Sequence, residues 1–219
     1  MKILVIGNAE QQAECRAKFG PGHHFQDCTS WEEARSLMAT VQVIFDFASA
    51  NSDRVQPIPS ELPADVFVDT SQSRLTDWLK RYGVSGQRIY GFCGLRTFLA
   101  REVLEVTLAP GGKVQDLEKV CAALGTSFQV VADQAGMISP RVIGMIINEA
   151  FYTLEEGTAT REDIDLAMKL GTNYPYGPFE WAERIGLKDL VSMLEAVYRE
   201  TNDERYRICP LMIDQARLS

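Results

Sequence analysis

Dinucleotide chemistry commonly starts at a glycine-rich turn between a strand and a helix, and this chain has a candidate turn at Gly7-Asn8-Ala9-Glu10-Gln11-Gln12. In the pattern Gly-x-Gly-x-x-Gly, the glycines let the backbone approach a pyrophosphate that sits on the helix N-terminus. Only the first glycine is present here. Ala9 adds a methyl group at the second position, and Gln12 adds bulk at the third. Two readings stay open: a weakened nucleotide site, or a sheet without cofactor affinity.

Two carboxylates near this turn favour opposite interpretations of it. Asp27 lies twenty residues after Gly7, at the expected end of the second strand, where a carboxylate would bind a ribose hydroxyl. Glu10 would stand close to the pyrophosphate. At about 4 Å and an effective dielectric of 20, the repulsion is on the order of 4 kcal/mol. The turn therefore predicts weak or absent dinucleotide binding.

Histidines and cysteines offer little for metal or nucleophilic chemistry. The chain contains only His23 and His24, which are adjacent and, in a strand, point to opposite faces, so a surface pair is favoured over a metal site. The cysteines are odd in number, scattered and without paired metal-type spacing, which indicates reduced thiols in a cytoplasmic protein. They are Cys15, Cys28, Cys93, Cys121 and Cys209.

Short β-branched runs alternate with helical periods through the first part of the chain. This alternation predicts an α/β fold with an open, mostly parallel, doubly wound sheet covered by helices. Ser30, three residues before Glu33, is placed to cap one of the helices. The expected strands are residues 1–7, 23–28, 41–47, 66–69, 89–93, 103–108 and 127–131, and the longer expected helices are 9–19, 75–81 and 113–124.

Helical periods take over after Asp133, so we expect a sheet domain at residues 1–133 and an all-helical domain at 134–219. Thr160 with Asp163 predicts a capped helix start, and Gly157 and Gly171 are placed to end helices in the left-handed conformation. The expected helices of this part are residues 140–156, 161–170, 179–185, 188–200 and 211–217.

The composition narrows the class of protein. With 219 residues, 46 % hydrophobic and 24 % charged, the chain has the make-up of a folded globular protein. A formal charge of -8 would repel a phosphate backbone, so nucleic acid is not an expected partner. No apolar run approaches the roughly 18 residues that a membrane helix needs, so we expect no membrane association and no signal peptide.

Long strings in the second part of the chain resemble the C-terminal domain of 3-hydroxyacyl-CoA dehydrogenases. They are Gly136-Met-Ile-Ser-Pro-Arg, Asp163-Ile-Asp-Leu-Ala-Met-Lys-Leu-Gly171 and Tyr174-Pro-Tyr-Gly-Pro-Phe-Glu180. The resemblance is strong over residues 136–186 and continues more weakly to Met1. It implies a shortened Rossmann-like sheet domain, with little room between Phe47 and Val66 for the usual helix. It also implies NAD as cofactor, an acyl-CoA substrate, and a homodimer formed through the helical domain.

In the resembled family, a histidine and a glutamate form the catalytic pair, and a serine and an asparagine help to hold the substrate oxygen. Leu104-Glu105-Val106 matches the family's Val-Glu-Val string, and Cys93, twelve residues earlier, stands where the histidine belongs. Ser71, in Asp69-Thr70-Ser71, falls on the serine of the family's Asn-Thr-Ser. Pro140 replaces the asparagine. The resemblance thus assigns Glu105, Ser71 and Cys93 to the catalytic positions and Gly7 and Asp27 to the cofactor.

Cys93 is a poor replacement for a histidine. A thiol has an ordinary pKa of about 8.5, and activation as a nucleophile needs a nearby cation or helix terminus, whereas Glu105 acts against ionisation. A buried, inert thiol is the favoured interpretation. Pro140 supplies no polar side chain and is suited to begin its helix.

Two functions remain open from the sequence. The first is a protein of the dehydrogenase lineage whose NAD-dependent hydride transfer is impaired or lost. The second is a non-enzymatic dimeric module that binds an acyl-CoA-like ligand or a partner subunit. The aromatic residues Tyr174, Tyr176, Phe179 and Trp181 either line an acyl pocket or pack between domains.

Overall fold

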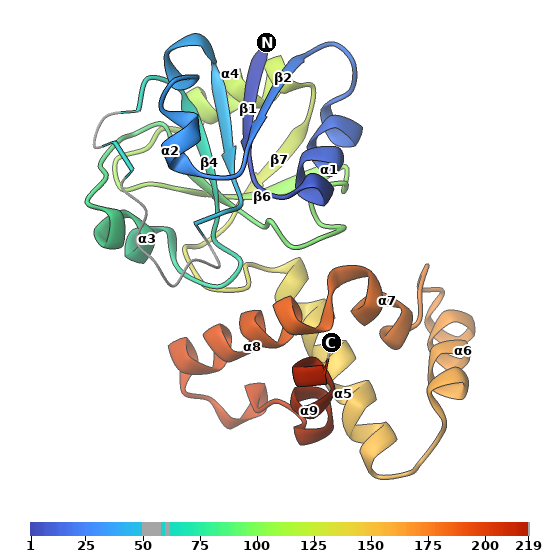
Figure 1. Ribbon diagram of the computed structural model, residues 1–219. Helices are drawn as coiled ribbons and strands as arrows, with labels where there is room; N and C mark the ends of the chain where they lie inside the picture. The colour runs from blue at the N-terminus through green and yellow to red at the C-terminus, as the bar shows by residue number, and fades with distance from the viewer. Residues whose placement is uncertain (50–57, 60–61, 219) are drawn as a thin grey trace. The chain divides into compact units, whose positions relative to one another are not determined.

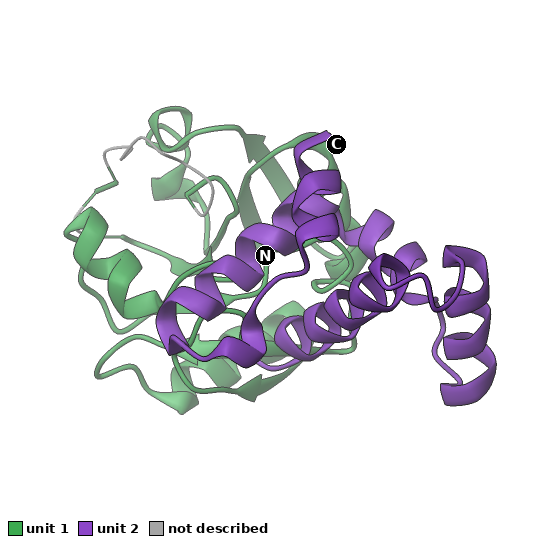
Figure 2. Cartoon of the chain, turned by 90° about the horizontal axis from the view of Figure 1, so that it is seen from below, with its two compact units in different colours: residues 1–137 green, residues 138–219 purple. Residues whose placement is uncertain are grey.

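The computed structural model describes residues 1–49, 58–59 and 62–218, and it divides the chain into two compact units, Met1–Met137 and Ile138–Ser219 (Figures 1 and 2). The division lies beyond the expected boundary at residue 133. The segment after the last strand stays with the sheet because Asp133 Oδ1 accepts from the Leu75 amide at 2.6 Å and the Gly136 amide donates to the Ser71 carbonyl at 2.9 Å.

Unit 1 is a seven-stranded sheet with the order β2-β1-β3-β4-β5-β6-β7. Every neighbouring pair is parallel except β5 and β6, which are antiparallel. The expected doubly wound, mostly parallel sheet is confirmed. The strands are β1 (Lys2–Ile6), β2 (His24–Cys28), β3 (Val43–Asp46), β4 (Asp65–Asp69), β5 (Ile89–Phe92), β6 (Val103–Leu108) and β7 (Ser127–Val130).

Both faces of the sheet are covered, which is why the central strands are continuous apolar runs. Alternate residues of β1 enter different cores: Ile3 and Val5 pack on the side of α1 and α4, and Leu4 and Ile6 pack on the side of α2 and α3. Ser30 caps α2, as expected, by accepting from the Glu33 amide. The helices are α1 (Ala9–Phe19), α2 (Trp31–Ala34), η1 (Met38–Thr40), α3 (Leu75–Tyr82) and α4 (Val114–Leu124).

The segment between β3 and β4 contains residues 50–57 and 60–61. The expected lack of a helix there lies outside the described residues.

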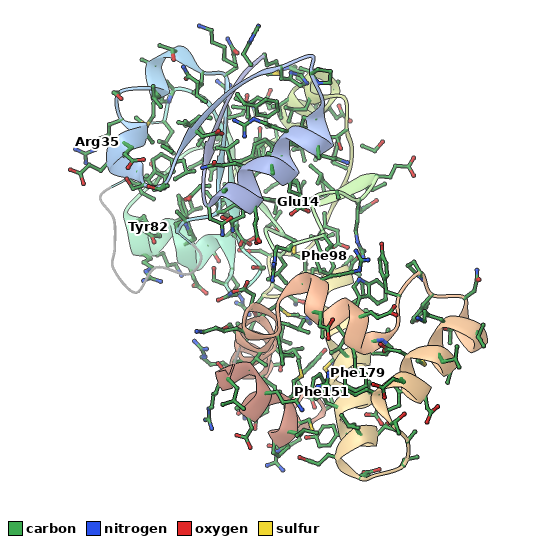
Figure 3. The ribbon with its side chains drawn as sticks, turned by 45° about the vertical axis from the view of Figure 1, so that its right-hand side comes forward. Glu14, Arg35, Tyr82, Phe98, Phe151 and Phe179 are labelled. Carbon is green, nitrogen blue, oxygen red and sulfur yellow. The ribbon has the colours of Figure 1, made fainter. Side chains whose placement is uncertain are left out.

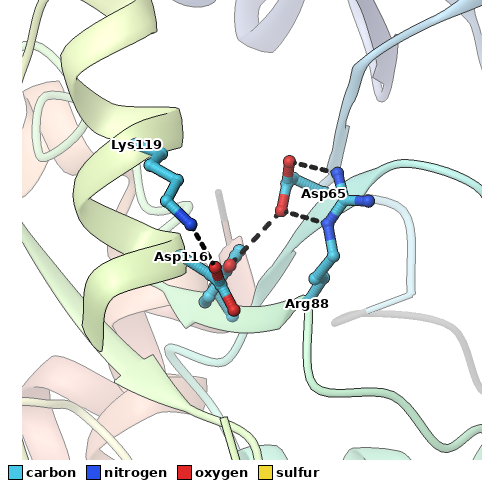
Figure 4. A network of polar contacts seen from close by, with 5 residues as sticks. Asp65, Arg88, Asp116 and Lys119 are labelled. Atoms are coloured by element: carbon cyan, nitrogen blue, oxygen red, sulfur yellow. Dashed lines mark hydrogen bonds and ion pairs between the residues drawn. The ribbon is translucent and has the colours of Figure 1, made fainter. Parts of the chain in front are cut away.

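The amino ends of β4 and β5 are joined by a polar network (Figure 4). Asp65 accepts from Arg88 Nε at 2.9 Å, pairs with its terminal nitrogen at 2.6 Å, and accepts from the Tyr90 hydroxyl at 3.3 Å. Nearby on α4, Lys119 pairs with Asp116 at 3.0 Å. Burial raises the pKa of Tyr90, so its hydroxyl stays protonated and keeps donating. At the amino ends of β4 and β5, these polar groups therefore serve to hold the structure together.

Unit 2 is all-helical, as the sequence predicts. Thr160 caps α6 by accepting from the Asp163 amide at 3.2 Å, and Gly157 has the expected left-handed conformation. The expectation for Gly171 is wrong. α6 runs past it to Thr172, and Asn173, with φ 56°, takes the left-handed position. The helices are α5 (Ser139–Glu155), α6 (Arg161–Thr172), α7 (Pro178–Ile185), α8 (Leu187–Thr201), η2 (Glu204–Tyr206) and α9 (Pro210–Leu218).

The long sequence motifs of α6 and α7 form the junction between these two helices. The buried Asp165 carboxylate accepts from the amides of Phe179 at 2.8 Å and Glu180 at 3.1 Å, which caps α7. Lys169 pairs with Glu180 at 2.6 Å. A Cβ atom at Gly177 would lie only 2.2 Å from Asp165 Cγ, so the approach of the two segments requires glycine. These sequence motifs therefore have a structural role.

The aromatic residues of this junction pack within unit 2. The Phe179 and Phe151 rings lie 5.0 Å apart (Figure 3), while the rings of Tyr174 and Tyr176 lie 5.8 and 6.2 Å from the Trp181 ring.

None of the helices formed by the described residues is both long and apolar enough to cross a membrane.

Candidate functional site

The turn between β1 and α1 is closed by its own side chains. Asn8 Oδ1 accepts from the Gln11 amide at 3.0 Å, and Gln11 Oε1 accepts from the Asn8 amide at 2.9 Å. Gln12 donates to the Gly7 carbonyl at 2.8 Å. A Cβ atom at Gly7 would lie 2.6 Å from Gln11 Oε1, so the Gln11 side chain already fills the space beside the glycine.

A pocket of about 280 Å³ lies beside this turn, lined by Gly7, Asn8, Gln11, Thr29, Phe47 and Ala48. The residues present do not fit a dinucleotide held in the glycine-rich manner. The Gln11 amide, one of the donors at the start of α1, is already bonded to Asn8, and Gln11 occupies the space where a phosphate would approach Gly7.

The other predicted cofactor residue, Asp27, lies on β2 and forms an ion pair with Arg16 of α1. The Arg16 guanidinium also lies over the Phe25 ring, 5.5 Å from its centre. Arg16 therefore joins α1 to β2 through both a charge and an aromatic contact. A ribose hydroxyl that reached Asp27 would share the carboxylate with this cation.

The repulsion assigned to Glu10 from the sequence is too large. The Glu10 side chain is 67 % exposed and pairs with Arg96 at 3.2 Å. Solvent and the guanidinium both screen its charge, and exposed pairs of this kind contribute little energy. The obstacle to a pyrophosphate is thus mainly steric, from Asn8 and Gln11.

One face of α1 holds the segment that follows β5. Glu14 accepts from the Ala100 amide at 3.3 Å and from neighbouring amides of this segment, and Lys18 donates to the carbonyls of Arg101 and Glu102. Burial raises the pKa of Glu14, against the lowering effect of the amides. Figure 3 labels Glu14 on α1 and Phe98 on the segment. In the sequence, this contact is indicated only by the spacing of four residues from Glu10 to Glu14 to Lys18, which places them on one face of a helix. The contact was not identified from the sequence.

Cys93 and Glu105, which the resemblance assigns to the catalytic pair, lie close to each other. The antiparallel register pairs Phe92 with Val106, so the next step places Cys93 beside Glu105. Cys93 is buried, and burial raises the pKa of its thiol well above the ordinary value; the charges of Asp69 and Glu105 raise it further. The thiol is therefore held in its neutral form, the opposite of an activated nucleophile.

Ser71, the third predicted catalytic residue, is fully buried directly after β4. Its amide donates to Asp69 Oδ1 at 2.9 Å, and the Gly94 amide donates to the same oxygen at 2.9 Å. Asp69 therefore links the turn that carries Ser71 to the turn that begins at Cys93. Burial raises the pKa of Asp69 to about 6, against the lowering effect of these amides. Reasoning from the sequence missed this residue, although an acid at the end of a buried strand was a usable signal.

A second buried acid, Asp46, is the last residue of β3. Asp46 accepts from Trp31 Nε1 at 2.9 Å and from the amides of Ala48 and Ser49 at 3.0 and 3.1 Å. Trp78 Nε1 donates to the Ser49 hydroxyl at 2.8 Å. Burial raises the pKa of Asp46. This carboxyl group is surrounded by donors, which indicates a structural role.

The histidines lie far from this chemistry. His23 Nδ1 is 3.2 Å from the amino group of Met1, and His24 starts β2, which four other strands separate from the strand that carries Glu105. Within the described ranges, no group of three or more His, Cys, Asp or Glu side chains is arranged to hold a metal. Pro140 is the second residue of α5, one position after the helix start that was expected for it.

Taken together, the carboxyl ends of β4 and β5 hold a buried carboxyl group, a neutral thiol and a buried serine, with Glu105 beside the thiol. No histidine lies among these groups, and Asp69, whose pKa burial raises to about 6, has two amides on one of its oxygens. The arrangement has the positions of the resembled catalytic site without its histidine.

Comparisons with known proteins show which family this chain resembles. A family model described as 3-hydroxyacyl-CoA dehydrogenase, C-terminal domain, matches residues 136–218. The 3-hydroxybutyryl-CoA dehydrogenase of Clostridioides difficile is 36 % identical over 200 residues, which cover 89 % of this chain and 70 % of that protein. The 3-hydroxyadipyl-CoA dehydrogenase of Escherichia coli is 43 % identical over 94 residues, which cover 43 % of this chain and 20 % of that protein.

Solved structures agree on the fold. The crystal structure of (S)-3-hydroxybutyryl-CoA dehydrogenase from Ralstonia eutropha matches with a TM-score of 0.74 and 20 % identity, covering 99 % of this chain and 93 % of that chain. The chain spans 20, 31 and 64 % of the length of three of its curated relatives. Given the coverage and identity of the Clostridioides difficile relative, the chain belongs to the 3-hydroxyacyl-CoA dehydrogenase family.

Proposed function

We propose that this protein belongs to the oxidoreductase lineage of the 3-hydroxyacyl-CoA dehydrogenases but has lost most or all NAD-dependent hydride transfer. The observation that carries the proposal is Cys93. It stands beside Glu105, where the family resemblance places the catalytic histidine, and it is buried with a raised thiol pKa. A neutral thiol cannot take the hydroxyl proton that must leave as hydride departs.

The turn after β1 supports the same conclusion. In the resembled family NAD supplies the hydride acceptor, yet Asn8 and Gln11 fill the start of α1 here. The loss of the histidine and the closure of the turn are independent changes. Restoring histidine at Cys93 alone would therefore leave the protein without a bound acceptor.

The test combines a binding titration of NADH with a turnover assay on a 3-hydroxyacyl-CoA. We expect no low-micromolar binding of NADH, and a rate at least ~10²–10⁴-fold below that of an active family member, because a general base is missing. The Clostridioides difficile relative, assayed in parallel, serves as the active control. An ordinary rate would show that the catalytic site is misassigned, with Cys93 and Glu105 the first residues to substitute.

We further propose that unit 2 forms a homodimer. Its supporting feature is an open, mainly apolar groove of about 800 Å³ along α5 and α6, lined among others by Val142, Met145, Ile146, Ala150 and Ile164. Val142 is 55 % exposed. Apolar surface of this kind on a folded protein marks an interaction site, and the self-complementary face of a second copy would cover it.

Val142→Glu is expected to shift the protein from dimer to monomer, because it buries a charge in the shared face. Light scattering at micromolar concentration measures the mass. Val114→Glu, the same change at an exposed residue in the first turn of α4 in unit 1, is the matched control and should leave the dimer intact. A monomeric parent protein would refute the dimer.

The same groove supports a rival, a non-enzymatic module that binds an acyl-CoA-like ligand. Titration with an acyl-CoA discriminates between the two functions, since the module would bind it tightly without turnover in the presence of NAD. Nucleic acid and membranes remain unexpected as partners. The charge of -8 supports the first of these expectations.

A further inference from the structure

The connection between β5 and β6, residues 93–102, presents a group of backbone amides to one carboxylate of α1. Glu14 Oε1 accepts from the Ala100 amide at 3.3 Å. The amides of Thr97 and Leu99 face the same carboxylate, and both favour its charged form. Three amides that are close in the sequence therefore converge on one anionic group.

The backbone of this connection is shaped to present these amides. Thr97 has φ 76°, a left-handed conformation that few residues with a side chain adopt and that persists only where the surroundings hold it. Successive amides in a turn of this kind form a concave nest that binds anions. Leu99 is fully buried, so its amide needs an acceptor supplied by the protein.

The carbonyl side of the same connection meets a cation of the same helix. Lys18, one helical turn after Glu14, donates to the Arg101 carbonyl and, at 3.3 Å, to the Glu102 carbonyl. Amides carry partial positive charge and carbonyls carry partial negative charge. The two side chains of α1 therefore match the polarity of the backbone that they hold.

The charges around Glu14 also suit an anion. Arg96, which pairs with Glu10 at 3.2 Å, lowers the pKa of Glu14, as the three amides do. Burial of the carboxyl group acts in the opposite direction. The amides and the guanidinium are thus the groups that compensate for taking this carboxylate out of water.

We propose that residues 97–100 form an anion-binding nest for a carboxylate, and that Glu14 is its built-in occupant and a positioning residue for the connection. The connection begins at Cys93 and leads into β6, which carries Glu105, so this carboxylate fixes the path between those two residues. Because Glu14 belongs to the chain, its effective concentration at the nest keeps free anions out. The inference involves neither NAD nor hydride transfer, so it can fail while the proposed function holds, and the reverse.

Glu14→Ala tests the nest, because it removes a CH2–COO⁻ group, which has the size of an acetate ion. Acetate added to the intact variant should move the Thr97, Leu99 and Ala100 amide resonances along one saturable NMR titration curve, toward their positions in the parent protein. Chloride at the same ionic strength and the neutral analogue acetamide should not do so, because the nest selects a charged carboxylate. In the parent protein, acetate should leave the three resonances unchanged.

Two further measurements test the strength of the nest and the positioning role. In Glu14→Ala without acetate, protection of the Leu99 amide from hydrogen exchange should fall roughly tenfold, because a bond to a charged acceptor is lost, and acetate should restore it. Alkylation of Cys93 by iodoacetamide, followed by mass spectrometry, should become faster in this variant and slow again with acetate. Alkylation of Cys209 in unit 2 should stay the same.

Glu10→Ala is the matched control, because it removes a carboxylate one turn earlier on α1 whose side chain is 67 % exposed, and acetate should not move the three amides there. An equal response to acetate and chloride, or unchanged Leu99 protection in Glu14→Ala, would overturn the nest. An unchanged alkylation rate of Cys93 would overturn the positioning role.

If Glu14→Ala does not fold, Glu14→Gln decides, because glutamine keeps an oxygen acceptor and loses the charge. Protection of the Leu99 amide several-fold below that of the parent protein supports a carboxylate nest. Equal protection in the two proteins refutes it.

Discussion

Asp69→Asn is expected to raise the free energy of unfolding at pH 8 by roughly 3 kcal/mol. The pKa of Asp69 is raised from 3.8 to about 6 in the folded protein, mainly by burial. A folded-state pKa above the unfolded value means that the folded state binds the proton more tightly, so stability falls as pH rises from about 4 to about 6. Asparagine accepts the same amide bonds and does not pay this penalty.

Urea denaturation at several pH values measures this effect. The stability difference between the Asp69→Asn variant and the parent should grow between pH 4 and pH 6 and then stay constant to pH 8. Asp27→Asn, on an ion-paired carboxylate at β2, should show no such gain. An Asp69→Asn variant that is less stable than the parent at pH 8 would mean that the carboxylate is stabilised by an interaction that asparagine cannot make.

Gly177→Ala is expected to destabilise the protein by roughly 2–4 kcal/mol. The added methyl group would meet Asp165 Cγ at 2.2 Å and Cβ at 2.3 Å, and Cβ cannot swing away as the end of a flexible side chain can. Any shift of Asp165 breaks its bonds to the Phe179 and Glu180 amides at the start of α7. The backbone at Gly177 has φ -71°, so the cost comes from the contact and not from the dihedral angle.

Gly171→Ala is the matched control for this prediction, and its sign should be opposite. Gly171 lies inside α6 with no heavy atom near the added carbon, so alanine should stabilise the helix by up to about 1 kcal/mol. Thermal unfolding of both variants measures the pair. Destabilisation by both substitutions would show that the left-handed ending expected from the sequence for Gly171 is right after all.

The strands could be predicted because their residues carry the fold locally. The run from Ile3 to Ile6 is buried on both faces, and such strands are apolar at every position. Caps at Ser30 and Thr160 are equally local, since donor and acceptor lie three residues apart. The ending of α6 was mispredicted because both Gly171 and Asn173 suit the left-handed conformation, and only the packing of the helix selects between them.

The candidate site was predictable only in part. Cys93 and Glu105 could be paired because a motif fixes their spacing. The pairing of Glu10 with Arg96 joins residues 86 positions apart, and it changes the electrostatic argument that the sequence suggested. The role of Asp69 depends on two amides from different turns converging on one oxygen, a geometry that no residue pattern encodes.

Among the described residues, the sheet ends on one side at β2, whose outer edge has backbone groups without a neighbouring strand. Such an edge is a template for association between chains unless polar or charged side chains interrupt it. Here His24, Gln26 and Asp27 interrupt the strand, and Arg16 covers the ring of Phe25. The side chains that bind α1 to β2, Arg16 and Asp27, are therefore also the kind of charged groups that disfavour the pairing of an edge strand with another chain.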